Sequence, residues 1–392
     1  MVMNKRRMPA MLVLGTLLAV LLSSCGGREA DRNSISCSYK ELGNPYTVSD
    51  MGMLYAADDN TIRFTDINSN ENVYVCSRLN CRHGIGSDGE QCQAVSGMLL
   101  PSLLMDSGHI YIIGTSVSEG KGSCAVIYRE NLDGSEREKI AVVDDVDFVN
   151  CALLSGEEIL FSYNRTIDYS DSLNPSELEH PGAGCVRYNL KTGKTQRYEC
   201  GSDDVYFINV GKIYKDDKYL YIYYSYTNDK DDGDSSQERE WKSAVNRYGL
   251  DSDESEDKEQ PDILCDTIAG IAFGEGYAAY VSDGLYITDF EDTVRVADGT
   301  DIFNPVINDG KLYYEKAYND YEEGVWYCYD IASQADEKIA EEKHYYNFTV
   351  SGKYVWFIGF DEPKEWGVIY KLKIKDFIDG NFENKEEVNY SV

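Results

Sequence analysis

The stretch Asp309-Gly310-Lys311-Leu312-Tyr313-Tyr314 joins a turn to an aromatic-rich strand, and this unit recurs along the chain. Turn residues precede most copies, and the strand that follows is apolar and often contains tyrosine. The seven copies are Met53–Ala56, His109–Ile112, Glu158–Phe161, Tyr219–Ile222, Tyr277–Tyr280, Lys311–Tyr314 and Tyr354–Phe357. Their mean spacing is about 50 residues, which lies in the range of β-propeller blades.

A second strand signature follows the first at some distance. Its copies are Arg63–Ile67, Ile127–Leu132, Arg187–Leu190, Arg247–Leu250, Cys328–Ile331 and Tyr370–Leu372. A polar turn and one more short strand usually come next, as in Lys194–Tyr198. Four short strands that close with a hairpin make one propeller blade. A β-sandwich, the alternative, has no reason to repeat the same two-strand signature seven times.

The sequence therefore predicts an all-β protein with a single β-propeller, most simply of seven four-stranded blades. The fifth unit, roughly 268–300, is short, so six or eight blades stay open. Residues 37–50 are a candidate to complete the last blade. We expect residues 1–24 to be a lipoprotein signal peptide, 25–46 a lipidated N-terminus and tether, and 47–392 the propeller.

The N-terminal residues carry the layout of a secretory signal. Lys5, Arg6 and Arg7 precede a mostly apolar run from Met8 to Leu22, which is too short to span a bilayer as a mature helix. The run ends in Leu22-Ser23-Ser24-Cys25, which resembles the lipobox of bacterial lipoproteins. This resemblance implies that Cys25 is lipidated and becomes the new N-terminus. We expect the protein on the outer face of the bacterial cytoplasmic membrane, held there by its lipid.

Composition excludes one class of partner. The formal net charge is −32, with 69 acidic residues against 37 basic ones. Proteins that bind nucleic acid neutralise phosphates with Lys and Arg, so a nucleic-acid partner is not expected. Tyrosine is the outlier, with 32 Tyr against 12 Phe and 4 Trp. Tyrosine suits half-buried strands, and it also stacks and hydrogen-bonds at binding surfaces, so we expect a glycan or peptide ligand.

The sharpest chemical signature is a cysteine–histidine cluster at Cys76, Cys81, His83 and Cys92. Three thiols and one imidazole can close a four-ligand shell, and Cys₃His is a known structural zinc set. The alternative is a disulfide drawn from the three cysteines, since exported proteins meet an oxidising environment. Inert packing is the third option. Five other cysteines, expected in or beside strands of five different blades, are interpreted as small buried hydrophobes: Cys124, Cys151, Cys185, Cys265 and Cys328.

Two short motifs carry a family resemblance. Tyr286-Ile287-Thr288-Asp289 and Phe64-Thr65-Asp66 are similar to the Tyr-Trp-Thr-Asp signature of low-density-lipoprotein-receptor propellers. The region after Cys25 resembles uncharacterised bacterial surface lipoproteins that carry propellers of that type. Their Cys-x₄-Cys-x-His-x-Cys element matches Cys76, Cys81 and His83, whereas the interval before Cys92 is longer here. The resemblance implies fold and location, and no activity.

No catalytic motif is present in the sequence. It contains no Gly-x-Ser-x-Gly elbow, no His-Glu-x-x-His helix and no Gly-rich phosphate loop. A glycosidase needs only two carboxylates, but 69 acids do not single out a pair. Asp289 and Glu315 are more naturally strand-end turn residues than catalytic groups. We therefore expect a non-enzymatic binding module, with a carboxylate-based lyase or glycoside hydrolase and a non-catalytic scaffold as the alternatives.

Overall fold

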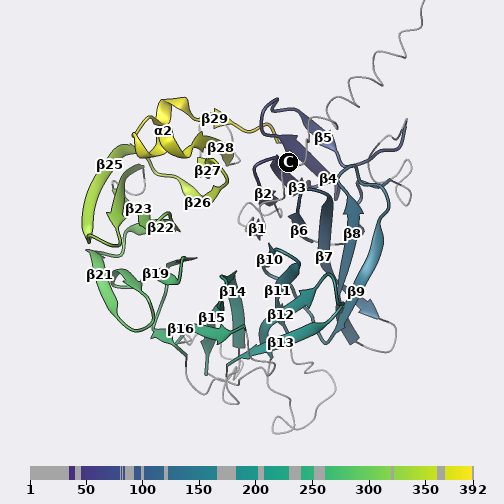
Figure 1. Cartoon of the computed structure of the whole chain (residues 1–392), viewed down its shortest axis with the longest axis horizontal. Helices are drawn as coiled ribbons and strands as arrows, with labels where there is room; N and C mark the ends of the chain where they lie inside the picture. Colours follow the sequence, from purple (N-terminus) through teal and green to yellow (C-terminus); the bar gives the residue numbers. More distant parts are fainter. Residues whose placement is uncertain are drawn as a thin grey trace, which may run out of the picture.

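The computed structural model describes residues 35–39, 46–79, 81, 83, 92–98, 101–118, 122–165, 182–201, 207–228, 240–250, 261–318, 322–359 and 367–390. The expected signal peptide and Cys25 lie outside the described residues. The described chain forms a ring of seven four-stranded antiparallel blades around a central axis, as Figure 1 shows. The predicted all-β propeller with seven blades is confirmed.

Each blade is built from one continuous segment, and its strands run in order from the axis outward. Blade 1 contains β2 (Tyr46–Val48), β3 (Gly52–Ala56), β4 (Ile62–Asp66) and β5 (Asn72–Tyr74). Blade 2 contains β6 (Ser102–Met105), β7 (His109–Ser118), β8 (Gly122–Asn131) and β9 (Glu138–Asp144). Blade 3 contains β10 (Ala152–Ser155), β11 (Glu158–Asn164), β12 (Ala183–Asn189) and β13 (Thr195–Cys200). Blade 4 contains β14 (Phe207–Lys215), β15 (Tyr219–Thr227), β16 (Lys242–Gly249) and β17 (Ile263–Cys265).

The remaining three blades follow the same plan. Blade 5 contains β18 (Gly270–Gly274), β19 (Tyr277–Val281), β20 (Gly284–Thr288) and β21 (Thr293–Asp298). Blade 6 contains β22 (Ile302–Asn308), β23 (Lys311–Tyr318), β24 (Glu323–Asp330) and β25 (Ala335–Lys343). Blade 7 contains β26 (Tyr346–Ser351), β27 (Tyr354–Gly359), β28 (Val368–Lys373) and β29 (Glu386–Glu387), with the helices α2 (Ile374–Ile378) and η2 (Phe382–Asn384) between its last two strands. The seven copies of the first sequence signature are the second strands of the seven blades.

The N-terminal segment departs from one expectation. Residues 37–50 do not complete the last blade, because blade 7 has four strands of its own. Instead, β1 (Ile35–Tyr39) pairs with β2 of blade 1 and with β10 of blade 3, which joins these blades into one nine-stranded sheet. A strand therefore lies within residues 25–46, where the sequence predicts a tether. The repeat cannot reveal β1, because this strand belongs to no blade.

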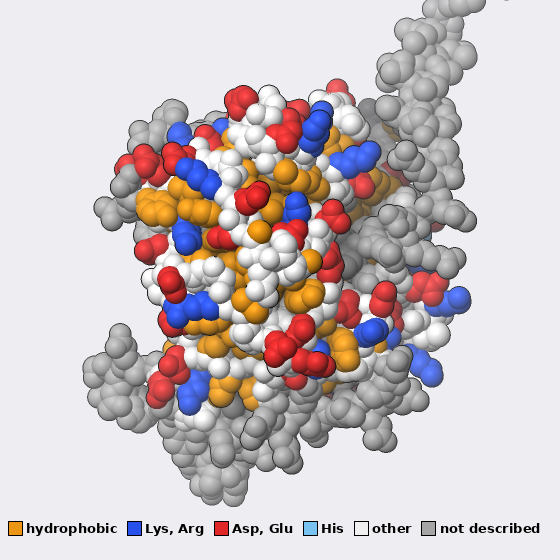
Figure 2. Space-filling model, turned by 60° about the vertical axis from the view of Figure 1, so that its left-hand side comes forward, with side chains coloured by type: hydrophobic (Ala, Val, Ile, Leu, Met, Phe, Trp, Pro, Cys, Tyr) orange, Lys and Arg blue, Asp and Glu red, His pale blue; other side chains and the backbone are white. Residues whose placement is uncertain are grey.

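Seven hydrophobic clusters hold the ring together, and each is shared by two neighbouring blades. The second strands are buried on both faces because a blade packs against each side, so β3 and β27 are apolar without alternation. The outer strands are the exposed ones. The edge strand β25 carries mostly charged residues, which disfavours edge-to-edge aggregation. Figure 2 shows acidic and basic side chains dispersed over the side of the molecule that it brings forward.

Ring closure relies on packing between blades 7 and 1 rather than on a shared strand. Trp356 of β27 is 2% exposed and belongs to one cluster with Met53 of β3. The amine of Lys371 donates to the carbonyl of Ile67, and the backbone N–H of Asn389 donates to Asn70 Oδ1 at 2.9 Å. The residues that follow β29 therefore bind the outer part of blade 1.

Aspartate and tyrosine cooperate in the first turns of the blades. In blade 2, Asp106 Oδ1 accepts the backbone N–H of His109 at 2.7 Å, and Oδ2 accepts the Tyr111 hydroxyl at 3.0 Å. In blade 4, Asp216 binds the hydroxyl of Tyr221 at 2.8 Å in the same way. Burial raises the pKa of Tyr221, and the hydrogen bond to Asp216 adds to this shift, so its hydroxyl stays a donor. Part of the tyrosine excess therefore serves to close turns.

Candidate functional site

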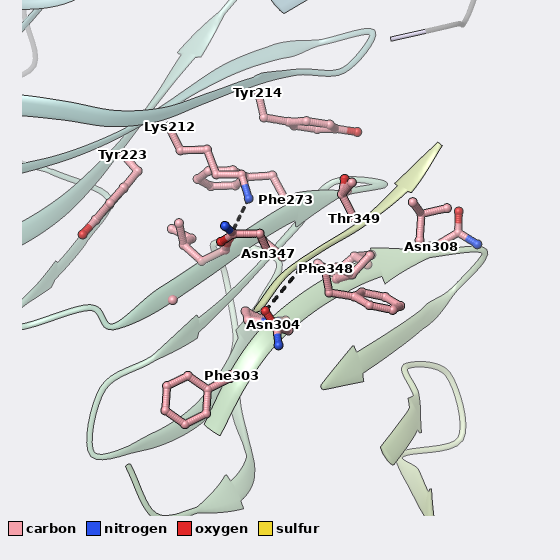
Figure 3. Close-up of a pocket in the computed structure, with 18 of the residues that line it drawn as sticks. Lys212, Tyr214, Tyr223, Phe273, Phe303, Asn304, Asn308, Asn347, Phe348 and Thr349 are labelled. Atoms are coloured by element: carbon pink, nitrogen blue, oxygen red, sulfur yellow. Dashed lines mark hydrogen bonds between the residues drawn. The ribbon is translucent and has the colours of Figure 1, made fainter. Parts of the chain in front are cut away.

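The inner strands of blades 4 to 7 line a cavity of about 600 Å³ within the ring. Figure 3 shows side chains from several strands projecting into it, among them Lys212 of β14 and Asn347 of β26. A volume of this size is within the usual range of ligand pockets. The cavity is made by the ring rather than by one segment, since Lys212 and Asn347 are 135 positions apart in the chain.

Three of the inner strands around the cavity are interrupted at corresponding places. The pairing register shifts between Val210 and Lys212 in β14, between Phe303 and Val306 in β22, and between Tyr346 and Thr349 in β26. Asn304 and Asn347 lie inside the last two shifts with φ angles of 53° and 52°. Asparagine tolerates this left-handed conformation better than most residues do. Such bulges redirect side chains and are frequent beside functional sites.

The cavity wall combines aromatic rings with a few polar groups. Its aromatic residues are Tyr214, Tyr223, Phe273, Phe303, Tyr345, Tyr346 and Phe348. The amine of Lys212 donates to the carbonyl of Ile271 at 2.9 Å, and the Tyr223 hydroxyl donates to the carbonyl of Ile268 at 3.2 Å. Asn347 is half-buried, and its side-chain amide makes no hydrogen bond within the described part of the chain. The wall thus offers ring faces and amide groups to a bound molecule.

A buried contact between a histidine and a glutamate lies at one edge of the cavity. Nδ1 of His344, a lining residue, is 3.1 Å from Oε1 of Glu315, and the two side chains are 1% and 0% exposed. Asn304 donates to Glu315 Oε2 at 2.9 Å and to the carbonyl of Tyr345 at 2.6 Å. The side-chain oxygen of Asn304, Oδ1, accepts the backbone N–H of Phe348 at 3.3 Å. Asn304 therefore links the carboxylate of blade 6 to the inner strand of blade 7.

The prediction that Glu315 is a strand-end turn residue is wrong, because it lies in the middle of β23 and is fully buried. The prediction for Asp289 is confirmed. Asp289 is exposed and accepts the backbone N–H groups of Glu291 and Asp292 at 2.9 and 2.8 Å. These two hydrogen bonds lower the pKa of its carboxyl group.

Glycine at position 324 makes room for the buried carboxylate. A Cβ at Gly324 would lie 1.8 Å from Glu315 Oε1, so no other residue fits without displacing the side chain. Gly324 belongs to β24, which pairs with β23. A glycine within a strand signals such a close approach, but the sequence alone does not show which atom approaches it.

The structure brings together all four predicted metal ligands. The ligand atoms of Cys76, Cys81, His83 and Cys92 lie within 4.8 Å of one another. Cys92 Sγ is 3.6 Å from His83 Nδ1. Tetrahedral zinc with bonds near 2.3 Å to sulfur and 2.1 Å to nitrogen has ligand separations of roughly 3.6 Å, so this edge already fits. No disulfide joins any two of the nine cysteines whose sulfur atoms are described.

The C-terminal end of the segment that carries this cluster is bound to blade 2, and the N-terminal end of the segment is bound to the C-terminal end. Arg137 pairs with the buried carboxylate of Glu130 at 2.6 Å and donates to the carbonyls of Val95 and Gln93, each at 2.6 Å. Burial raises the pKa of Glu130, while the adjacent guanidinium lowers it. The side chain of Gln93 in turn accepts the backbone N–H of Ser77 at 3.1 Å, beside Cys76. The ligands are thus held by the protein itself.

The histidine of the cluster is also held by an aromatic neighbour. The rings of His83 and Tyr74 stack with centroids 4.3 Å apart, and Arg63 lies over the Tyr74 ring at 4.5 Å. A hydrogen bond from the backbone of His83 lowers the pKa of Cys81, whereas burial raises the pKa of Cys92 to about 11. Three thiols and an imidazole that are anchored in this way fit a metal site.

The other cysteines follow the sequence-based expectation except in their distribution. Cys124 and Cys185 are buried within strands, as expected for small hydrophobes. The expectation of five different blades is wrong, since Cys151 immediately precedes β10 and therefore belongs to blade 3 with Cys185. No helix among the described residues is long and apolar enough to cross a membrane.

Comparisons with known proteins support no family assignment. No protein-family model matches the chain, and no curated protein matches it. The β-propeller domain of the trilobed protease from Pyrococcus furiosus is 9% identical, over 91% of this chain and 98% of that domain, with a TM-score of 0.47. The acylaminoacyl peptidase of Pyrococcus horikoshii and a puromycin hydrolase are each 11% identical, with TM-scores of 0.49. The alignments cover 93% and 95% of this chain, and 54% and 55% of those enzymes. We transfer no activity from them.

The Gly324→Ala substitution should lower the free energy of unfolding by about 1–3 kcal/mol, because the added methyl group displaces the Glu315 carboxylate from its buried position. Urea denaturation measures this change. Gly249→Ala is the matched control, since no atom lies within 4 Å of the Cβ added there. Equal destabilisation by the two substitutions would contradict the packing described for Glu315.

Proposed function

We propose that this protein is a lipid-anchored propeller on the outer face of the bacterial cytoplasmic membrane and binds a glycan in its central cavity. The cavity lined by blades 4 to 7 is the observation that carries the proposal. A sugar ring has an apolar face that stacks on aromatic rings and hydroxyl groups that bind amides. Phe303 of blade 6 and Asn347 of blade 7 are both half-buried lining residues and offer one of each. A peptide is the alternative ligand, and the same screen tests it.

The cavity favours binding over hydrolysis. Glu275 is the only Asp or Glu among the described residues that line it, and its carboxylate accepts the backbone N–H groups of Asp309 and Gly310 at 2.6 and 2.8 Å. A glycoside hydrolase commonly uses two carboxyl groups that flank the scissile bond. The two carboxylate oxygens of Glu275 already accept hydrogen bonds from a turn, so this residue is poorly suited to catalysis. We therefore rank the hydrolase below the binding module.

The Asn347→Gly substitution should weaken glycan binding about tenfold, because it removes the amide while glycine keeps the left-handed backbone. A thermal-shift screen of the chain from residue 28 onward against glycans, peptides and cell-wall fragments identifies the ligand, and calorimetry measures its affinity. Gln334→Gly is the control, since this exposed turn residue has a φ of 58° and does not line the cavity. If no glycan raises the melting temperature, or if both variants bind equally, the proposal is wrong.

Anchoring depends on Cys25. The Cys25→Ala variant should stay unlipidated and uncleaved at this site, and it should fail to incorporate an alkyne-labelled fatty acid during growth. Cys37→Ala is the matched control, because it removes a cysteine only 12 positions away and should keep the label. Normal maturation and labelling of the Cys25→Ala variant would exclude the lipobox.

We further propose that Cys76, Cys81, His83 and Cys92 hold a structural zinc ion. A full shell of four protein ligands leaves no open position for substrate. The cluster also connects β5 of blade 1 to β6 of blade 2 along the chain. Zinc bound there would stabilise this connection, because metal binding to the native state alone adds to folding free energy.

Protein purified anaerobically without a His-tag should contain about one zinc per chain by mass spectrometry. The Cys81→Ser variant should lose the metal, whereas Cys265→Ser should keep it, because Cys265 lies in blade 4 outside the cluster. A chelator or acid should lower the melting temperature of the wild type, since acid protonates the ligands. A protein that ignores chelators but is destabilised by reductant contains the disulfide instead.

A further inference from the structure

The N-terminal strand β1 occupies one side of the central channel. It pairs with the inner strands of blades 1 and 3 and packs against β6 of blade 2. Figure 1 places β1 inside the ring, beside β2, β6 and β10. The cavity lies on the other side, against the inner strands of blades 4 to 7. The channel is therefore shared between a segment of the chain and the space for a ligand.

The register of β1 shows at which end of the ring the chain enters. Ile35 pairs with Ser155, which also pairs with Glu158 across the turn between the first two strands of blade 3. At its other end, Tyr39 pairs with Tyr46, the first residue of blade 1. We define the turn face as the end of the ring where the first and second strands of each blade are joined. The opposite end is the far face, and β1 runs from the turn face to the far face.

From this threading we infer that the turn face points toward the membrane and that ligands enter the cavity from the far face. The inference rests on the proposed lipid anchor at Cys25. Nine residues lie between Cys25 and Ile35, and a chain of this length reaches at most about 35 Å. This tether leads directly into β1, which is paired with a strand on each side. It therefore restricts how far the ring can rotate relative to the membrane.

The distribution of charge keeps the turn face off the lipid. The seven first turns, at residues 49–51, 106–108, 156–157, 216–218, 275–276, 309–310 and 352–353, carry seven acids against two lysines. Anionic headgroups repel such a surface at distances up to the Debye length of about 8 Å. The ring should therefore be held by its tether rather than by direct adsorption.

The far face carries the exposed apolar side chains that a ligand or partner would contact. Six of the eleven exposed large hydrophobic residues in the described chain lie there, at strand ends or in connections between blades: Leu79, Val117, Phe148, Trp241, Tyr318 and Tyr346. Only Leu132 and Ile378 lie at the turn-face end, and the other three are on outer strands. Tyr346 is 39% exposed and also lines the cavity. Aromatic residues at a pocket mouth suit the stacking of a glycan.

Energy transfer from the two faces to the membrane tests the orientation. The donor dye is attached at residue 218 on the turn face or at residue 241 on the far face, since Lys218 and Trp241 both belong to blade 4. A clickable amino acid is used at each position, because the chain has 11 cysteines and thiol labelling would not be specific. Each lipidated full-length protein carries a donor dye and is reconstituted on vesicles with acceptor-labelled headgroups. The ring is about 25–30 Å thick along strands of this length, so transfer from residue 218 should be at least about twofold that from residue 241.

A variant in which residues 35–39 are replaced by Gly-Ser repeats tests the role of β1. It should bind vesicles as well as the parent protein does, but its two donor positions should transfer equally. Equal transfer in the parent protein, or stronger transfer from residue 241, would overturn the inference. Failure of the parent protein to bind vesicles better than Cys25→Ala would instead overturn the lipid anchor. The two failures are therefore distinguishable.

Discussion

The structure depends on the packing of each blade between two neighbours. The second strand of every blade has apolar side chains on both faces, and each face belongs to a hydrophobic cluster shared with the adjacent blade. An isolated blade would expose both of its faces to water, so it cannot bury these side chains without a neighbour on each side. Burial of one large apolar side chain contributes about 1.5–3 kcal/mol, so the ring is stable only when all seven interfaces form. Closure between Trp356 and Met53 is thus as important as any internal interface.

The same packing decides what the ring can offer at its axis. The inner strands of blades 6 and 7 bulge at Asn304 and Asn347, and both residues take a left-handed conformation there. Asn304 uses its amide to bind Glu315 and Tyr345, which ties blade 6 to blade 7. Asn347 has the corresponding position in the next blade but leaves its amide available to the cavity. The same bulge therefore has a structural role in blade 6 and a proposed ligand-binding role in blade 7.

The cysteine–histidine cluster is organised separately from the cavity. Its anchors are Arg137 and Glu130 of blade 2, and its histidine stacks on Tyr74 of blade 1. None of its ligands lines the cavity. The proposed zinc would stabilise the connection between blades 1 and 2 and would not contact the cavity wall. This separation lets the two proposals be tested independently.

The sequence by itself determined the fold class and the second strand of every blade, because a local turn followed by an apolar strand is encoded in neighbouring residues. It favoured seven blades but left six or eight open, and the structure decided the count. The sequence also identified all four members of the Cys₃His cluster, whose spacing is short. It misjudged Glu315, since burial of that carboxylate depends on Gly324 of the paired strand and on His344 beyond the end of β25.

Only the tertiary structure decided the cavity and the place of β1. The cavity wall is assembled from inner strands that are distant in the chain, and their spacing depends on ring closure. The strand β1 pairs with blades 1 and 3 through backbone hydrogen bonds, which leave little trace in side-chain patterns. Neighbouring residues encode which side chains of a strand are buried, whereas the pairing of distant segments depends on the folded ring.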